Sequence, residues 1–251
     1  MFKTISNGQS IHQYIPPHLK RMFYNNPAAV HASQNGIDPY GFSTDGLVLY
    51  APLWAMKDSA FKSVDVCRHT CSVVGALWRP NGRLLDGNDY IESTTPALNF
   101  TAGSFSVWVW VYPTTILGGS HILLCRGLSG NDGWYSQVTT TGTLEMVTNG
   151  AAAKQSYSNA GAVVINKWQL VGFTRSGTTG KVWVDSVDVT TTSATHGAIT
   201  TSARTLKVGI YDDKASSPFI GIIGEFGVTS GALSAGEWMQ LYQKTKWRYQ
   251  S

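Results

Sequence analysis

The chain has 251 residues, enough for one large all-β domain or for a domain of about 200 residues with an extension. Only 14% of the residues are charged, whereas Gly (26), Tyr (11) and Trp (9) are abundant. This composition is typical of short strands joined by tight turns and argues against a helical protein rich in Glu, Lys and Leu. The net charge of +4 arises mainly before residue 38, where three basic residues are accompanied by no acid, and the other 16 basic and 15 acidic residues nearly cancel. A nucleic-acid-binding surface on the folded body is therefore not expected.

Residues 1–43 differ from the rest of the chain and predict an extended N-terminal arm. They hold four prolines and three histidines, and the Pro16–Pro17 pair favours a short helix over residues 18–24. A disordered tail is the alternative, but the arm is richer in aromatic residues than such tails usually are. We expect it to contact its own domain or a neighbouring subunit. The residues expected to anchor it are Phe2, Tyr14, Lys20, Arg21, Phe23 and Tyr24.

No signal peptide is expected, because the first residues lack an apolar stretch, and no run approaches the length of a membrane span. The three cysteines cannot all pair with one another. Cys67 and Cys71 have the spacing of a zinc half-site, but no second pair follows and His69 lies between them. Buried or half-buried free thiols in a reducing compartment are therefore expected.

From residue 46 onward, apolar runs with the period of strands alternate with turn sequences rich in Gly, Asn, Asp and Ser. About a dozen short strands at such spacing predict a sandwich or barrel. A βαβ arrangement is excluded because no helical pattern intervenes. The expected strands cover residues 46–53, 70–74, 83–85, 89–92, 104–112, 121–125, 134–139, 143–148, 154–157, 168–174, 181–185, 187–189, 205–211 and 219–229.

The strand expected at residues 104–112 is apolar on both faces in its second half. Phe105, Val107, Val109 and Val111 lie on one face, and Ser106, Trp108, Trp110 and Tyr112 lie on the other. The pattern indicates either a central strand covered on both sides or a concave face lined by aromatic rings.

One helix is expected near the C-terminus, at about residues 235–247. Ser234 and Glu237 form a capping box, in which each side chain satisfies a backbone amide at the start of the helix. Trp238, Leu241 and Tyr242 then recur at helical spacing, so this stripe should lie against the sandwich.

Several segments resemble, in order, the LamG-like group of the concanavalin A-like jelly rolls. The resemblance covers about residues 46–249. It implies that residues 44–251 form an all-β domain, a two-sheet antiparallel jelly-roll sandwich with one C-terminal helix. Two departures stand out: Ser186 takes the place of a common glycine after Asp185, and the segment around Glu225 lacks the family's usual aspartate. The matching segments are residues 46–53, 85–91 (LDGNDYI), 105–113 (FSVWVWVYP), 167–171, 180–185 (GKVWVD), 206–209, 219–221 and 231–242.

LamG-like domains preceded by a short arm and lacking an export signal are similar to structural proteins of tailed bacteriophages. This resemblance implies a virion location after synthesis in the host cytoplasm, with an extracellular location as the alternative. It also implies partners among other virion proteins, reached through the arm, and assembly as a homo-oligomer. Neither a nucleic-acid nor a membrane partner is expected.

Catalysis is not expected from the residue patterns. Glycosidases that share this sandwich carry an E-x-D-x-x-E strand, because an acid and a nucleophile must face each other across the scissile bond. None of the four glutamates (Glu92, Glu145, Glu225 and Glu237) has this spacing. No G-x-S-x-G elbow is present, and His69 and His121 are interpreted as ordinary hydrogen-bonding residues.

Two kinds of ligand site are considered. Glycan binding needs an aromatic platform beside polar groups, and the candidates are Trp134, Tyr135, Tyr211, Asp212 and Asp213, with core packing or a subunit interface as the alternative. A Ca²⁺ site would need several convergent oxygens; its candidates are Asp132, Asp212 and Asp213, whose alternative role is in turns. No cofactor is otherwise expected.

The sequence thus predicts a non-enzymatic virion structural protein, either a capsid decoration protein or a tail or fibre component, that displays a LamG-like sandwich. The alternative is a lectin-like module that binds a surface glycan with or without Ca²⁺.

Overall fold

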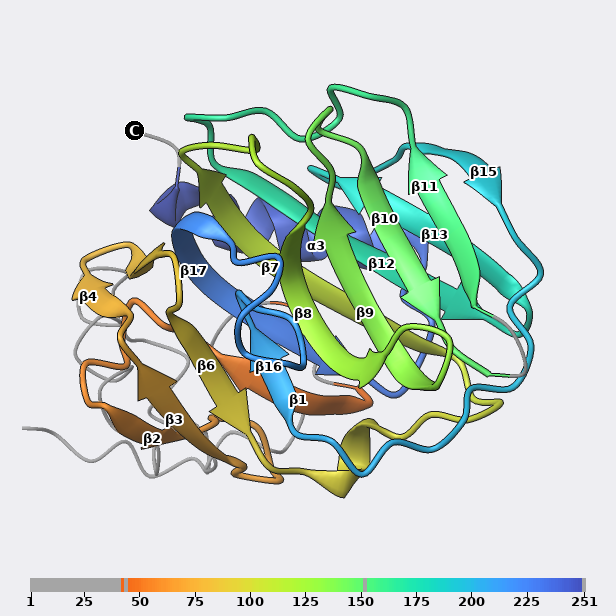
Figure 1. Ribbon diagram of the computed structural model, residues 1–251, viewed down its shortest axis with the longest axis horizontal. Coiled ribbons are helices and arrows are strands. Elements are labelled where there is room, and N and C mark those ends of the chain that lie inside the picture. Colours follow the sequence, from red (N-terminus) through yellow and green to blue (C-terminus); the bar gives the residue numbers. More distant parts are fainter. Residues whose placement is uncertain (1–41, 43–44, 151–152, 250–251) are drawn as a thin grey trace, which may run out of the picture.

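The computed structural model describes residues 42, 45–150 and 153–249, and these form two antiparallel sheets packed face to face (Figure 1). Sheet A has the order β14 (Val187–Asp188), β13 (Thr179–Val184), β12 (Gln169–Ser176), β7 (Phe105–Pro113), β17 (Ile220–Thr229), β5 (Gly82–Asp86) and β4 (Leu77–Arg79), with β1 (Leu47–Ala51) also paired to β17. Sheet B has the order β15 (Thr190–Ser193), β11 (Lys154–Ser158), β10 (Leu144–Thr148), β9 (Asp132–Val138), β8 (His121–Leu128), β16 (Leu206–Val208), β6 (Tyr90–Ser93), β3 (Thr70–Val74) and β2 (Ala60–Lys62). A short 3₁₀ helix, η2 (Pro96–Leu98), follows β6. The predicted sandwich is confirmed.

Each strand expected from the sequence is present, with ends shifted by a few residues, and three further strands were not predicted. These are β2, β4 and β15, each of which lies at the end of its sheet in the described part of the chain. They are short and expose most of their side chains, so they lack the apolar alternation that marks the central strands.

Strand β7 is covered on both faces, as one of the two interpretations of its sequence predicts. Phe105, Val107, Val109 and Val111 belong to the core between the two sheets. Trp108 and Trp110 point the other way, into a second apolar cluster on the outer face of sheet A. Sheet A therefore needs a cover on its outer side.

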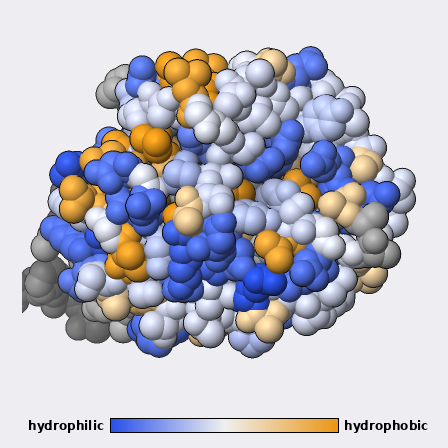
Figure 2. All heavy atoms as spheres, viewed as in Figure 1, coloured by the Kyte–Doolittle hydropathy of each residue, from blue (hydrophilic) through white to orange (hydrophobic). Residues whose placement is uncertain are grey.

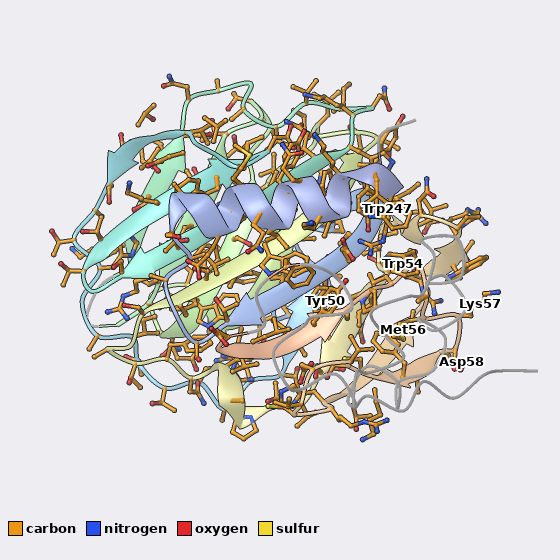
Figure 3. The ribbon with its side chains drawn as sticks, turned by 180° about the vertical axis from the view of Figure 1, so that it is seen from behind. Tyr50, Trp54, Met56, Lys57, Asp58 and Trp247 are labelled. Atoms are coloured by element: carbon orange, nitrogen blue, oxygen red, sulfur yellow. The ribbon has the colours of Figure 1, made fainter. Side chains whose placement is uncertain are left out.

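Helix α3 (Ala235–Thr245) supplies that cover, and Figure 3 shows it crossing the outer face of sheet A. The predicted capping box is present: Glu237 N–H donates to Ser234 Oγ at 3.3 Å, and Ser234 N–H donates to the Glu237 carboxylate at 2.7 Å. Trp238 stacks on Trp183 with ring centroids 5.5 Å apart. Trp110 Nε1 donates to Thr245 Oγ1 at 2.8 Å, which fixes the other end of the helix on β7. The α-helix ends at Thr245 and continues as a 3₁₀ turn, η3 (Lys246–Arg248), so it is slightly shorter than predicted.

Phe42, inside the predicted arm, belongs to the cluster beneath the helix. It is 4% exposed, and its ring meets those of Tyr50 and Trp108 at centroid distances of 5.5 and 5.6 Å. The anchoring residues predicted for the arm lie outside the described residues. No helix in the described part of the chain is long and apolar enough to cross a membrane.

The hairpin turn between β13 and β14 departs from the family pattern in sequence but keeps a left-handed backbone. Asp185 has φ 48° and Ser186 has φ 70°, the region that a type I′ turn requires at both central residues. Leu170 N–H donates to Asp185 Oδ1 at 2.9 Å, which holds the turn in place without a glycine at residue 186.

The three cysteines are free, as predicted. Cys71 and Cys125 are buried, and burial raises the pKa of Cys71 to about 11 and that of Cys125 to about 12. Cys67 is exposed, contrary to the expectation of a buried or half-buried thiol, because it lies in the loop before β3 rather than in a strand.

Buried polar side chains join the loops at one end of the sandwich. Arg175 donates from Nη1 to Thr101 and Gly103 carbonyls, at 2.9 and 2.8 Å, and from Nη2 to the Gly197 carbonyl at 2.8 Å. Next to it, the imidazole of His196 bridges two hydroxyls at 2.7 Å, Thr148 at Nδ1 and Ser156 at Nε2. Burial, together with the charges of Arg175 and Lys154, lowers the pKa of His196 from 6.5 to about 4. The imidazole is therefore neutral at pH 7.

We predict that Trp238→Ala lowers the free energy of unfolding by about 3–5 kcal/mol, because it removes the indole that joins α3 to sheet A. Met239→Ala, on the same helix at a position that is 45% exposed, is the control and should change stability by about 0.5 kcal/mol or less. Urea unfolding followed by tryptophan fluorescence measures both. Equal losses for the two variants would contradict the packing described.

We also predict that stability falls on acidification in a window set by His196. In the unfolded chain the His196 imidazole binds a proton below about pH 6.5, whereas in the folded chain it binds one only near its pKa of about 4. The contribution of neutral His196 to the free energy of unfolding is thus constant above pH 6.5. It is lost as the pH falls toward 4, by at most about 1.4 kcal/mol per pH unit. His196→Asn should flatten this dependence, measured as urea midpoints at about pH 7.5 and about pH 5. The same slope in the variant would show that other groups cause it.

Candidate functional site

Two of the predicted glycan-binding aromatics are buried, and their assignment to a platform is wrong. Trp134 is 1% exposed, its indole N–H donates to the Leu98 carbonyl at 3.1 Å, and it belongs to the core between the sheets. Tyr135 is 6% exposed and lies in a small cluster on the outer face of sheet B with Ile122, Cys125 and Val147. A sugar ring cannot stack on either side chain in this structure.

Tyr211 is the predicted aromatic residue that remains partly exposed. Its ring meets the edge of Tyr135 at a centroid distance of 5.6 Å, and its hydroxyl accepts the Ser129 N–H at 2.7 Å. Burial raises the pKa of this phenol. Figure 2 shows the face of sheet B around these strands, which is mainly hydrophilic with scattered hydrophobic spots.

The three predicted metal ligands beside Tyr211 all have protein partners, and two of them are paired with cations. Arg204 Nε donates to Asp132 at 3.0 Å, and Arg204 Nη1 donates to Asp212. Lys207 Nζ lies 2.7 Å from the second oxygen of Asp212. Asp213 accepts the backbone N–H groups of residues 215 and 216 at 2.9 and 2.8 Å, and these bonds, together with one from the Ser216 hydroxyl, lower its pKa. The structure therefore does not bring the three carboxylates together as the Ca²⁺ site that the sequence predicted.

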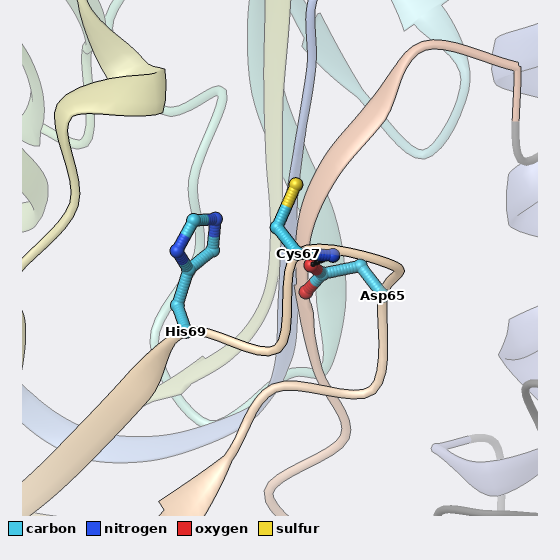
Figure 4. A group of neighbouring side chains, drawn as sticks. All are labelled: Asp65, Cys67 and His69. Carbon is cyan, nitrogen blue, oxygen red and sulfur yellow. Dashed lines mark hydrogen bonds between the residues drawn. The ribbon is translucent and has the colours of Figure 1, made fainter.

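Asp65, Cys67 and His69 form another group with metal-binding chemistry, drawn in Figure 4. One ligand atom from each lies within 4.8 Å of the others. Asp65, however, accepts the Tyr50 N–H at Oδ2 and the Cys67 N–H at Oδ1, both at 2.9 Å. His69 Nε2 lies 2.8 Å from the Val48 carbonyl, which can only accept, so this nitrogen carries the proton. These bonds brace the loop between β2 and β3 against β1 and account for the group without a metal.

The serine–histidine pair and the four glutamates, which are the groups most often used in hydrolysis, are buried or bonded to other protein groups. Ser156 and His196 form a serine–histidine pair, which the sequence spacing did not reveal, but both are completely buried. Each of the four glutamates has a protein partner. Glu92 accepts from Thr205, Glu145 from Gln137, Glu225 from Tyr50 and Glu237 from Ser234.

Among the described residues, the most exposed aromatic side chain is that of Trp247, and it lies elsewhere, where the loop after β1, strand β4 and the C-terminal turn η3 meet. We call this surface the tryptophan edge; its members are Trp54, Trp78, Trp247, Lys57, Lys246 and Arg248. Figure 3 shows Trp54, Lys57 and Trp247 along one end of the molecule, beside the C-terminal end of α3. Arg248 lies between two indoles, with its guanidinium carbon 4.7 Å from the Trp54 ring and 4.6 Å from the Trp247 ring.

Glu225 anchors this edge from inside the protein. It lies where the pairing of β17 with β7 shifts between Ile223 and Phe226, and such a bulge redirects side chains. The fully buried carboxylate accepts from Tyr50 Oη at 2.6 Å and from Trp54 Nε1 at 3.2 Å, and Arg248 Nη1 lies 3.3 Å from it. The bulge thus connects the core to the Trp54–Arg248 pair.

Trp247 is the outermost member of the edge and is held in a fixed orientation. Its side chain is 56% exposed, although its indole N–H donates to the Lys244 carbonyl at 3.0 Å and Arg248 lies against the ring. At the other end of the edge, Trp78 Nε1 donates to the Trp54 carbonyl at 3.1 Å, and Lys57 Nζ lies 4.7 Å from the Trp78 ring. The edge therefore offers an aromatic surface whose geometry is set before any ligand arrives.

The sequence held one signal for this surface. Trp247 falls outside the apolar stripe of the C-terminal helix, and a large aromatic residue off such a stripe does not serve the helix–sheet contact. Its neighbours Trp54, Trp78 and Glu225 are distant in sequence, so no local pattern connects them to it.

The comparisons with known proteins agree with this architecture. A family model described as the concanavalin A-like lectin/glucanases superfamily matches residues 85–237, and no curated protein sequence matches the chain. Trypanosoma rangeli sialidase, solved with 2,3-difluorosialic acid as a covalent intermediate, is similar with a TM-score of 0.66 and 17% identity, over 93% of this chain and 39% of that one. The ligand-binding domain of botulinum neurotoxin serotype D, solved with N-acetylneuraminic acid, is similar with a TM-score of 0.63 and 16% identity, over 80% of this chain and 52% of that one.

The chain thus spans about half the length of these solved chains or less, and at such identities the likeness shows a shared fold. The family model covers more than half of the chain and contains most of the segments on which the sequence resemblance rested, although residues 46–53 lie before it. This protein belongs to the concanavalin A-like lectin/glucanases superfamily.

Proposed function

We propose that this protein is a carbohydrate-binding module that holds its ligand at the tryptophan edge. The observation that carries the proposal is Trp247, which is 56% exposed yet fixed by Arg248 and by its own indole N–H bond. Sugars present apolar C–H faces together with hydroxyl groups, so they suit an exposed indole with polar side chains at its rim. Lys57 of the edge and its neighbour Asp58 are exposed and supply such polar groups.

The comparisons support this proposal at the level of the family. Two of the similar solved structures hold sialic acid or N-acetylneuraminic acid, one in a sialidase and one in a toxin domain. A sandwich of this fold thus occurs in proteins that bind or act on sugars. We propose binding without hydrolysis, because a hydrolase of this fold needs a pair of available carboxylates and each glutamate of this chain accepts a hydrogen bond from another protein group.

The predicted virion role is a separate matter and stays a prediction. It rests on the arm of residues 1–43, nearly all of which lies outside the described residues. Multivalent display on a particle would strengthen weak carbohydrate contacts, so the two roles are compatible. Glycan contact through Tyr211, Asp212 and Asp213 also stays a prediction, with less support, because Asp212 and Asp213 already have protein partners.

We expect Trp247→Ala to weaken carbohydrate binding by about tenfold or more, since the loss of an aromatic contact costs on the order of 1.5 kcal/mol. A glycan array identifies ligands of the wild type, and titration calorimetry with the best of them measures the variants. Trp247→Phe keeps a ring and should retain part of the affinity. Because Trp247 is exposed, thermal melting should be nearly unchanged in both variants.

Tyr211→Ala is the matched control, since it removes a partly exposed aromatic residue from the other sheet. It should bind as the wild type does. Loss of binding in Tyr211→Ala with full binding in Trp247→Ala would move the site to sheet B and contradict the proposal. Absence of any glycan ligand, with a change of particle mass in Trp247→Ala by analytical ultracentrifugation, would instead identify the edge as a subunit interface.

A further inference from the structure

Two lysines at the tryptophan edge contact aromatic rings and form no ion pair in the described part of the chain. Lys167, Lys181, Lys207 and Lys214 each form an ion pair with an aspartate or glutamate. At the edge, by contrast, Lys57 Nζ lies over the Trp78 ring, and Lys246 Nζ lies 5.2 Å from the Tyr242 ring.

A cation–π contact orders an ammonium group without neutralising it, because the ring carries no net charge. The positive charges of Lys57 and Lys246 are therefore held near the surface without compensation by an ion pair in the described part of the chain. Lys244 is exposed in the last turn of α3, three residues before Trp247, and adds a third positive charge.

Negative charge at the edge is scarce or already used. The Glu225 carboxylate is fully buried and paired with Arg248, so these two charges offset each other. Asp58 is the exposed acid that Figure 3 places beside Lys57. The exposed side chains of the edge thus carry a net positive charge next to an exposed indole.

We propose that the tryptophan edge is selective for anionic sugars, those that bear a carboxylate or sulfate group on the ring. This inference rests on the proposed function and assigns a ligand class to the same site. The sugar ring stacks on Trp247, and its anionic group reaches Lys57 or Lys246, whose long side chains can adjust to it. Because these charges are exposed, the contribution of the anionic group should be screened by salt, whereas the stacking contribution should not.

The test compares matched pairs of glycans that differ only in the anionic group: sialylated against asialo, uronate against the neutral hexose, and sulfated against unsulfated. The wild type should bind the anionic member of at least one pair about tenfold more tightly, and the preference should shrink between about 50 and about 500 mM NaCl. A preference in the sialic acid and uronate pairs shows that the site recognises a carboxylate. A preference in the sulfated pair shows that it recognises a sulfate.

The double variant Lys57→Gln/Lys246→Gln should lose the preference for the anionic member and keep its affinity for the neutral one. Lys154→Gln, at an exposed lysine on β11 of the other sheet, is the matched control and should behave as the wild type does. Lys57 and Lys246 lie at the surface, so the double variant should fold, and thermal melting checks this for both variants.

The outcomes separate the two proposals. Equal affinity for both members of every pair would overturn the anionic selectivity and leave carbohydrate binding intact. A preference that survives in the double variant would overturn the role of the edge lysines. No binding to any glycan would overturn both this inference and the proposed function.

Discussion

The structure depends on one constraint, which is that sheet A is apolar on both faces. Strand β7 directs phenylalanine and valine into the core and tryptophan outward, so neither face can be left in water. Sheet B covers one side and helix α3 covers the other. The capping box at Ser234 and the stacked Trp183–Trp238 pair fix where the helix starts and where it lies.

The tryptophan edge follows from that cover. After Thr245 the helix tightens into η3, which carries Trp247 and Arg248. The next residue, Tyr249, packs back against sheet A, where its ring stacks on that of Trp110 with centroids 4.5 Å apart. The bulge in β17 turns Glu225 toward the same place, and Gly224 leaves the room that the Tyr249 ring occupies. An exposed aromatic surface thus results from the way the chain ends its packing, and it is rigid because its inner side belongs to the core.

Charged groups elsewhere are used mainly within the protein. Arg83, Arg126 and Arg175 are buried and donate to backbone carbonyls of distant loops. On sheet B and in the loop after β16, Asp132 and Asp212 are paired with Arg204, and Glu92 is paired with Lys214. Such groups stabilise loops and register but leave little to recognise a ligand. Lys57 and Lys246 form no ion pair in the described part of the chain, and each lies over an aromatic ring, which does not cancel its charge.

Much of the fold could be predicted from the sequence, because its signals are local. Alternation marked the strands, glycine- and asparagine-rich turns separated them, and Ser234 with Glu237 marked the start of the helix. Only short edge strands, whose side chains are mostly exposed and give no period, were missed. The candidate site could not be predicted in the same way. Trp247 lies outside the apolar stripe of the helix, but nothing near it in sequence connects it to Trp54 or Trp78, and alternation did not reveal that Trp134 lies in the core.

The sequence by itself determined the strands, the helix and the two-sided character of β7, since periodicity and capping depend on neighbours within a few residues. Only the tertiary structure decided which aromatic rings face solvent and which charges are paired. Asp132 meets Arg204, and Tyr50 meets Glu225, across long stretches of chain. Burial and charge compensation are properties of contacts between distant segments, and no local pattern encodes them.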